Sequence, residues 1–523
     1  PTGRGKAYID PGCGTVRNSM PAPYTPTADF VAGTPGNPLP FCRINFNEYF
    51  MLVLEEQRVN TYGPVEQDIG DHTMAFFEAG YARSRSHRIL TPSFAVLQTV
   101  IVPADHRYNP TGNPLKFYGR VLGGNSPAAD QYYSSDTLHT VGGLSGDFEG
   151  LSSSKFGEWE WELSGTWSGN QFSTELSDML LGPLQTAINS CGPGDNPADC
   201  LNPFSTGAPN SKAILDRVTG ELRVQGNTQL STVGVDLGGP IVELPGGDLQ
   251  LAVGAQIRKE TASSNGDHDS NQYNYVFLLG NNDFQAERSI MAGYGELALP
   301  FFKGFELQAA GRVEDYDDVG STFDPMLGVS WTPATTFVGD GASPASKVRV
   351  RGTYATSFRA PSLLQTDGSQ TELARLFDTG PSAMDPSMPM QPTSATFRPV
   401  TTRGNPNLAP QTSTAITAGL EWSPFNGFTL QGDYWNYDYK EIIVKEAAQQ
   451  LIDADFMAKN PANPLGNPAI ERDPSRVVQR VNTNFINASS VMTHGIDIEL
   501  GYREKFGSAG TFSAPSSRQR PRW

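Results

Sequence analysis

Apolar and polar residues alternate one by one over many stretches of the chain, as in β-strands with one apolar and one polar face. In the clearest stretch, every odd position from Leu249 to Ile257 is apolar, whereas Gln250, Gln256 and Arg258 are polar. The same alternation recurs near residues 43–51, 71–89, 137–148, 158–169, 290–299, 305–315, 323–331, 348–354, 416–422, 428–434 and 496–502. The pattern predicts an all-β protein of about fifteen strands, with helical periodicity only near 173–189 and 446–459.

The joins between the expected strands differ greatly in length. If the strands run up and down, one end of the sheet holds the joins 300–304, 332–346, 424–427 and 487–494. The other end then holds 261–289, 316–322, 359–410 and 441–479, and all of these except 316–322 are much longer. Large loops are also expected near 103–135 and 172–226. Short turns at one rim and long loops at the other are typical of antiparallel outer-membrane barrels, whose short turns face the periplasm.

Alternation alone does not distinguish a transmembrane barrel from a soluble sandwich, because both have one apolar and one polar face. The aromatic residues favour the barrel, since several lie on apolar faces near strand ends, where an interfacial girdle would sit. These residues are Trp331, Tyr354, Trp422, Phe428, Tyr434 and Tyr502. A secreted soluble β-rich binding or adhesion protein is the alternative. A helical membrane protein is excluded, because the chain has no run of roughly 20 apolar residues.

Composition narrows the function classes. The formal charge is −17, from 55 acidic and 38 basic residues, which argues against nucleic acid as a partner. The 54 glycines and 40 prolines fit an all-β chain with many turns.

The four cysteines form two local pairs, Cys13 with Cys42 and Cys191 with Cys200, each in a turn-rich segment. This spacing predicts loop disulfides in an oxidising compartment. A zinc site and inert free thiols are the alternatives, although no CxxC is present and the six histidines are scattered.

Known catalytic motifs are missing from the sequence: it has no GxSxG, no HExxH and no P-loop. We therefore expect no enzyme activity and no cofactor, although a carbohydrate-active β-enzyme with paired carboxylates at a cleft is a third interpretation. Asp267, Asp269 and Asn271 place oxygen ligands at alternate positions, as calcium loops do, but the glutamate that completes an EF-hand loop does not follow. They are weak calcium candidates, and no metal is predicted.

Five segments, at 244–260, 311–333, 354–365, 405–424 and 484–500, occur in an order that resembles successive barrel segments of TonB-dependent outer-membrane receptors. They include GRVEDYDDVGSTFDPMLGVSWTP, YATSFRAPSLLQ and NPNLAPQTSTAITAGLEWSP. The resemblance is clear over residues 244–502 and fainter at 42–63.

The resemblance implies a 22-stranded barrel filled by an N-terminal plug, which imports a scarce nutrient such as an iron–siderophore, cobalamin or an oligosaccharide. It also implies outer-membrane lipid and a periplasmic TonB-type energy-coupling protein as partners, in a Gram-negative bacterium. We recognise no plug and no coupling box, and SAPSSRQRPRW at the end does not alternate. We therefore expect a partial receptor barrel over 1–506 and an unrelated or frameshifted tail over 507–523.

Candidate functional residues come from the FRAP motif and from the polar strand faces. Arg359 and Pro361 belong to FRAP, and a structural role is expected for both, since Pro361 would end a strand ladder by lacking a donor. The candidates for lining the lumen are Arg312, Glu314, Arg349, Arg351 and Glu421. The transported substrate itself is set by loops that match no motif.

Overall fold

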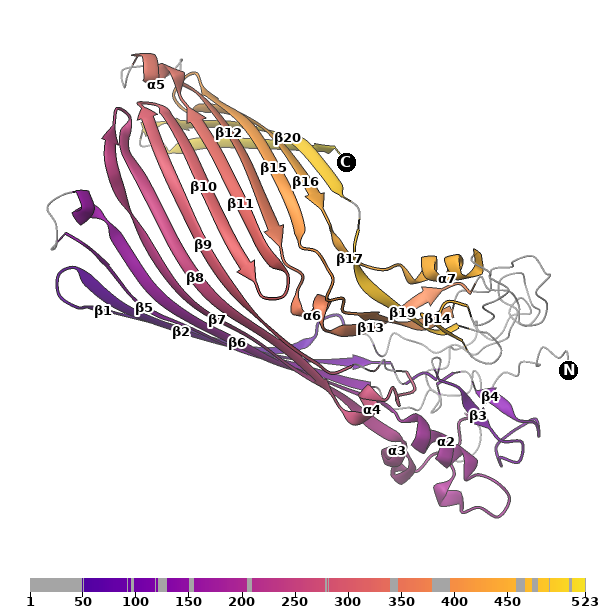
Figure 1. Ribbon diagram of the computed structural model, residues 1–523. Helices are drawn as coiled ribbons and strands as arrows, with labels where there is room; N and C mark the ends of the chain where they lie inside the picture. Colours follow the sequence, from indigo (N-terminus) through magenta and orange to yellow (C-terminus); the bar gives the residue numbers. More distant parts are fainter. Residues whose placement is uncertain are drawn as a thin grey trace.

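The protein is described by a computed structural model, in which one antiparallel sheet of fourteen strands dominates the described residues (Figure 1). The described residues are 49, 51–91, 93–95, 98–117, 119–120, 129–149, 155–204, 209–277, 280, 282–338, 347–378, 396–457, 466–472, 478–488, 490–507 and 510–522. The strands, in sheet order, are β1 (Glu55–Asp68), β2 (Thr73–Leu90), β5 (Ala129–Asp147), β6 (Glu160–Met179), β7 (Thr219–Leu244), β8 (Gly247–Gly266), β9 (Phe284–Phe302), β10 (Phe305–Tyr316), β11 (Gly320–Trp331), β12 (Lys347–Arg359), β15 (Gln411–Ser423), β16 (Phe428–Lys440), β20 (Val491–Lys505) and β21 (Thr511–Arg522). The predicted all-β fold is confirmed, but the sheet curves without closing, because β1 and β21 do not pair.

The two faces of this sheet differ in the way that the alternation predicts. One face carries large apolar side chains that are between about 40% and 60% exposed, and we call it the apolar face. Its members include Val233, Val235, Ile257, Met291, Val313, Phe323, Leu327, Val350, Ile416, Leu420, Ile496, Ile498 and Leu500. The opposite face, which we call the polar face, carries ion pairs between neighbouring strands, such as Arg258 with Glu314.

The two ends of the sheet are unequal. At the short-turn end the chain reverses through 69–72, 245–246, 303–304, 424–427 and 506–510, and through the longer joins 148–159 and 332–346. At the long-loop end the joins include 91–128, 180–218, 360–410 and 441–490. One expectation is wrong here: residues 478–487 do not run along the sheet, so the join 488–490 enters β20 at the long-loop end and not at the short-turn end.

The long loops fold into two modules with hydrophobic cores of their own. Loop module 1 combines β3 (Val100–Val102), β4 (Leu115–Phe117), α2 (Leu181–Asn189) and α3 (Lys212–Val218) around a core that includes Leu184, Ile188 and Val276. Loop module 2 is a small sheet whose strands are, in sheet order, β13 (Ser369–Leu376), β14 (Thr396–Arg403), β19 (Val478–Asn487) and β17 (Ile443–Lys445). A further strand, β18 (Ile470–Arg472), also pairs with β19, and α7 (Ala448–Met457) packs on this sheet. Figure 1 shows both modules gathered at the long-loop end.

The two stretches with helical periodicity correspond to short helices. In the first, residues 173–179 belong to β6 and only α2 is helical, whereas α7 fills most of the second. None of the described helices combines the length and the apolar character needed to cross a membrane. The strand expected at 43–51 lies almost entirely outside the described residues.

The tail forms an edge strand. Residues 511–522 pair antiparallel with β20, from Thr511 opposite Lys505 to Arg522 opposite His494. Pro515 and Pro521 lie in this strand, and Pro64 lies in β1 at the other edge. An edge strand tolerates proline because the side of the residue that lacks an N–H can face away from the paired strand.

Candidate functional site

A break in the ladder between β11 and β12 opens a cavity on the polar face. Thr332 donates its backbone N–H to Gly304, and with the β10–β11 register this places the nitrogen of Pro325 toward β12. Proline has no N–H to donate there, and the pairing of β11 with β12 ends at the adjacent pair, Met326 with Ala355. Beyond this point Asp324 accepts a side-chain hydrogen bond from Thr356 at 3.1 Å instead.

The cavity has a volume of about 460 Å³ and is lined by residues of β8 to β12 and by 360–362. Its charged lining residues are Glu260, Arg288, Arg312, Glu314, Asp324 and Arg359. These residues belong to five neighbouring strands, β8 to β12. They meet in one cavity because each lies near the long-loop end of its strand. Three guanidiniums and three carboxylates balance, so the cavity suits a ligand with both donors and acceptors better than a strong anion.

Glu314 is the centre of this charge network. Its side chain is only 7% exposed, and its Oε1 accepts from Arg258 Nη2 at 2.8 Å and from Arg312 Nε at 2.7 Å. Its Oε2 accepts from the Tyr316 hydroxyl at 2.7 Å. The guanidinium of Arg312 lies 5.1 Å from the ring centre of Tyr294. One buried carboxylate thus holds two arginines and a tyrosine from β8 and β10 in fixed positions.

Arg288 connects the strands to the FRAP segment. Its side chain is 2% exposed, its Nη2 donates to the Pro361 carbonyl at 2.6 Å, and its Nε lies 3.5 Å from Glu260 and 3.6 Å from Asp318. Pro361 lies two residues after the end of β12, and Ser362 caps α6 (Leu363–Thr366). The FRAP backbone is therefore held in place by a buried arginine of β9.

The two FRAP residues and the five candidates for lining the lumen divide into two groups. The structure brings Arg312, Glu314, Arg359 and Pro361 to the cavity, where Arg359 donates to Gln411 at 3.0 Å. Arg349, Arg351 and Glu421 lie outside it, nearer the short-turn end of the same face. There Arg351 pairs with Asp433 at 2.7 Å, Arg349 donates to Ser330, and Glu421 lies opposite Arg349 in the register.

Several residues of the site were not selected from the sequence, namely Arg258, Glu260, Arg288 and Asp324. The signal for Arg258 and Glu260 was present, because they share the parity of Gln256 along one strand. Arg288 carried no such signal, since residues 261–289 were expected to form a loop, whereas β9 begins at Phe284.

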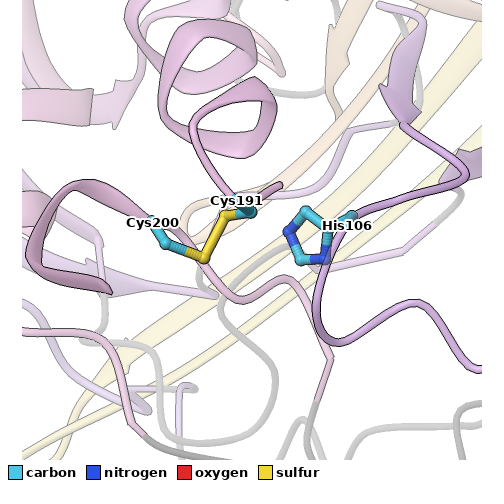
Figure 2. A group of neighbouring side chains, drawn as sticks. All are labelled: His106, Cys191 and Cys200. Atoms are coloured by element: carbon cyan, nitrogen blue, oxygen red, sulfur yellow. A yellow bond between two sulfur atoms is a disulfide. The ribbon is translucent and has the colours of Figure 1, made fainter. Parts of the chain in front are cut away.

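A second cluster lies in loop module 1, where Cys191 and Cys200 form a disulfide beside His106 (Figure 2). Cys13 and Cys42 lie outside the described residues. His106 is 3% exposed; its Nδ1 accepts the Tyr108 N–H at 3.2 Å, and its Nε2 donates to the Leu201 carbonyl at 3.1 Å. Both imidazole nitrogens and both sulfurs are thus already bonded, so this trio offers no free metal ligand in the disulfide form.

The burial of His106 predicts that the stability of loop module 1 depends on pH. Burial lowers the pKa of the His106 imidazole below its ordinary value of 6.5. As the pH falls below 6.5, the His106 imidazole binds a proton in the unfolded module but stays neutral in the folded one. The stability of the module therefore falls as the pH drops from 6.5 toward the pKa of the folded state. We expect proteolysis within 181–218 to be faster at about pH 5.5 than at about pH 7.5.

Pulse proteolysis with mass-spectrometric mapping measures this difference. In the His106→Gln variant, the rate of cleavage within 181–218 should change between the two pH values only as much as the rate of cleavage elsewhere in the chain. An equal pH dependence in wild type and variant would contradict the assignment.

The weak calcium candidates lie around α4 (His268–Asn271), where protein donors bind the Asp267 and Asp269 carboxylates, whereas Asn271 Oδ1 is buried without a hydrogen-bond partner. Asp267 caps this helix: Oδ1 accepts from the Ser270 N–H and the Tyr275 hydroxyl, and Oδ2 accepts from the Arg223 N–H. Asp269 accepts from the Asn274 side chain at 2.9 Å. This geometry gives Asp267 a capping role, which explains its position without an ion.

Comparisons with known proteins agree with this architecture. The family described as "TonB dependent receptor-like, beta-barrel" matches residues 81–522. The RagAB peptide importer is similar in structure at 11% identity and a TM-score of 0.50, covering 90% of this chain and 47% of that one. The siderophore receptor PirA from Pseudomonas aeruginosa shows 15% identity and a TM-score of 0.39, covering 93% and 69%. A mutant of the ferric enterobactin receptor PfeA from Pseudomonas aeruginosa, in complex with enterobactin, shows 12% and 0.41, covering 92% and 65%. No curated protein matches the chain significantly.

Proposed function

The chain belongs to the TonB-dependent receptor-like β-barrel family, and from this premise we propose that it serves as the barrel of a nutrient uptake receptor in the outer membrane of a Gram-negative bacterium. The nutrient would be a scarce compound such as an iron–siderophore, cobalamin or an oligosaccharide. A TonB-type protein would supply the energy for import. Barrels of this family belong to transport receptors and not to enzymes.

The apolar face carries this proposal. Side chains such as Ile257, Met291 and Phe323 are about 60% exposed, and they continue from β7 to β20. A soluble protein rarely exposes a contiguous apolar patch of more than a few hundred Å², whereas the apolar face extends across the sheet from β7 to β20. Against lipid the same surface is favourable, while the polar face lines the interior. The alternative of a secreted soluble protein does not account for it.

The position of the cavity supports a receptor role. It lies toward the long-loop end, where Glu260, Arg288 and Arg359 approach the FRAP segment. In this family's barrels the long loops face the outside of the cell. A ligand captured from the medium would therefore meet these residues before the rest of the polar face.

An adjacent pair of substitutions tests the membrane assignment. Ile416 is 45% exposed on the apolar face, and its neighbour Thr417 lies on the polar face opposite Thr353. Arginine facing lipid near the bilayer midplane costs about 2–4 kcal/mol. We therefore expect Ile416→Arg to reduce the amount of protein in the outer-membrane fraction and its heat-modifiable gel mobility, whereas Thr417→Arg leaves both near wild type.

A soluble protein gives a different result. If the wild-type chain stays dispersed without detergent, and both arginine variants behave alike, the chain does not use its apolar face against lipid. The receptor proposal then fails, whatever the chain binds.

A further inference from the structure

Three aromatic side chains follow one another along β16 toward the long-loop end. The ring centres of Trp435 and Tyr437 are 5.7 Å apart, and those of Tyr437 and Tyr439 are 6.2 Å apart. The second pair is close to parallel, with 23° between the ring planes, and the first pair is tilted by 40°. We call these three residues the aromatic ladder. Because they occupy alternate positions of one strand, all three lie on the same face.

That face is the polar one. Asp433 is in phase with the ladder along β16 and forms a bidentate pair with Arg351 of β12 across the strand between them. Tyr434, one residue away, has the opposite phase and shares the apolar face with Ile416 and Ile496. The aromatic ladder is therefore distinct from the interfacial aromatic residues, and lipid does not account for it.

Residues smaller than the rings flank the aromatic ladder on both neighbouring strands. On β15, Thr417, Ala415 and Ser413 lie opposite Trp435, Tyr437 and Tyr439 in turn. On β20, Gly495 and Thr493 lie opposite the first two rings, and Val491 lies opposite the third. Tyr439 is 40% exposed, and the other two rings are partly exposed. The three rings therefore project beyond the residues on either side of them. A linear oligomeric ligand could lie against the rings and over these flanking residues, which we call the floor.

The charges around the aromatic ladder favour a neutral ligand. On the polar face beside it, Asp433 and Asp497 are opposite one another, and Arg351 is already bound bidentately by Asp433. An anionic metal chelate would face an excess of carboxylate with no free cation among these three. Hydroxyls are plentiful instead, in the pairs Thr353 with Thr417 and Ser357 with Ser413.

We propose that the aromatic ladder binds a neutral oligosaccharide, with sugar rings against Trp435, Tyr437 and Tyr439 and sugar hydroxyls against the serine and threonine floor. A pyranose has an apolar C–H face that suits the negative face of an aromatic ring, and a hydroxyl rim that needs hydrogen-bonding partners. Because the rings repeat along β16, successive sugars can stack on them as the oligosaccharide moves along this strand. This inference rests on the proposed uptake function and names its substrate class.

Binding of neutral glycans to the full chain in detergent micelles tests this proposal. The probes are six-sugar fragments of α-glucan, β-glucan, xylan, mannan and galactan, and the best binder is titrated by calorimetry and tryptophan fluorescence. We expect Tyr437→Ala and Tyr439→Ala each to weaken binding by about tenfold. Trp435→Phe should keep the affinity within about threefold, because a ring remains, but abolish most of the fluorescence change.

Tyr434→Ala is the matched control, since it removes a ring from the same strand on the opposite face, and it should leave the affinity within about twofold. The proposal is overturned if no glycan binds, if only a ferric tris-catecholate binds, or if the alanine variants of the aromatic ladder match the control. Heat-modifiable mobility of the same preparations is measured first. A chain that inserts into membranes but binds no glycan refutes only the ladder proposal, whereas failure to insert refutes the receptor proposal.

Discussion

Replacing Glu314 by leucine is expected to lower the free energy of unfolding by about 2–4 kcal/mol. The substitution leaves Arg258 and Arg312 facing one another without the carboxylate that holds both, and it removes the acceptor of the Tyr316 hydroxyl. The loss lies toward the lower part of the range for a broken buried pair, because the two arginine side chains are still 24% and 33% exposed. Guanidinium titration in micelles, followed by tryptophan fluorescence, measures it.

Glu421→Gln is the matched control, because it neutralises another carboxylate on the same face, opposite Arg349. This variant should stay within about 0.5 kcal/mol of wild type. A triple variant that also changes Arg258 and Arg312 to methionine should recover much of the loss, since no charge is then left unpaired. If Glu314→Leu matches the control, the network does not stabilise the sheet.

Asp178→Ala is expected to detach loop module 1 from the long-loop end of β6. The Asp178 side chain is buried; its Oδ1 accepts from the Ser93 hydroxyl and from the Met179 N–H, and its Oδ2 accepts from the Phe277 N–H. The three donors come from three different segments of the chain. Leaving two buried N–H groups without an acceptor costs about 1–3 kcal/mol each. Local hydrogen exchange should therefore accelerate over 98–117 and 181–218 while the strands of the large sheet keep their protection.

Asp216→Ala provides the comparison within the same module. Asp216 pairs with Lys212 on the exposed side of α3, where both side chains are more than half exposed. Such a pair contributes about 0–1 kcal/mol, so the exchange pattern should remain close to wild type. Acceleration of the same size in both variants would show that Asp178 has no special role.

Most strands of the large sheet could be predicted from the sequence because they alternate, but β1, β7 and β21 were not among the expected strands. The phase of Leu249 to Ile257 identified the apolar face of β8, and the joins near 424–427 and 300–304 identified the short-turn end. The prediction failed where a strand served a different sheet. Residues 478–487 alternate like a barrel strand, but they pair with β14 and β18 in loop module 2, so the following join was placed at the wrong end.

The candidate site could be predicted only in part, because it depends on long-range register. Arg312 and Glu314 were recognisable from their phase within β10, and FRAP was recognisable as a motif. The cavity, however, requires the ladder to break at Pro325, and it requires Arg288 from a region expected to be loop. Neither follows from local periodicity. The loop modules were also missed, since their cores are assembled from short segments far apart in the chain.

The prolines of β1 and β21 affect how copies of this protein can associate. Ile69 donates to Thr73, and Phe506 donates to Gly510, so the two registers direct the nitrogens of Pro64, Pro515 and Pro521 away from their paired strands. Among the described residues no strand pairs with the outer side of β1 or β21, and each of these edges lacks a donor at one or two positions where an added strand would need one. A second copy joining edge to edge would leave its own carbonyls unbonded there, and in lipid each such group costs several kcal/mol. The edge strands β1 and β21 are thus poor templates for aggregation, although both are long and extended.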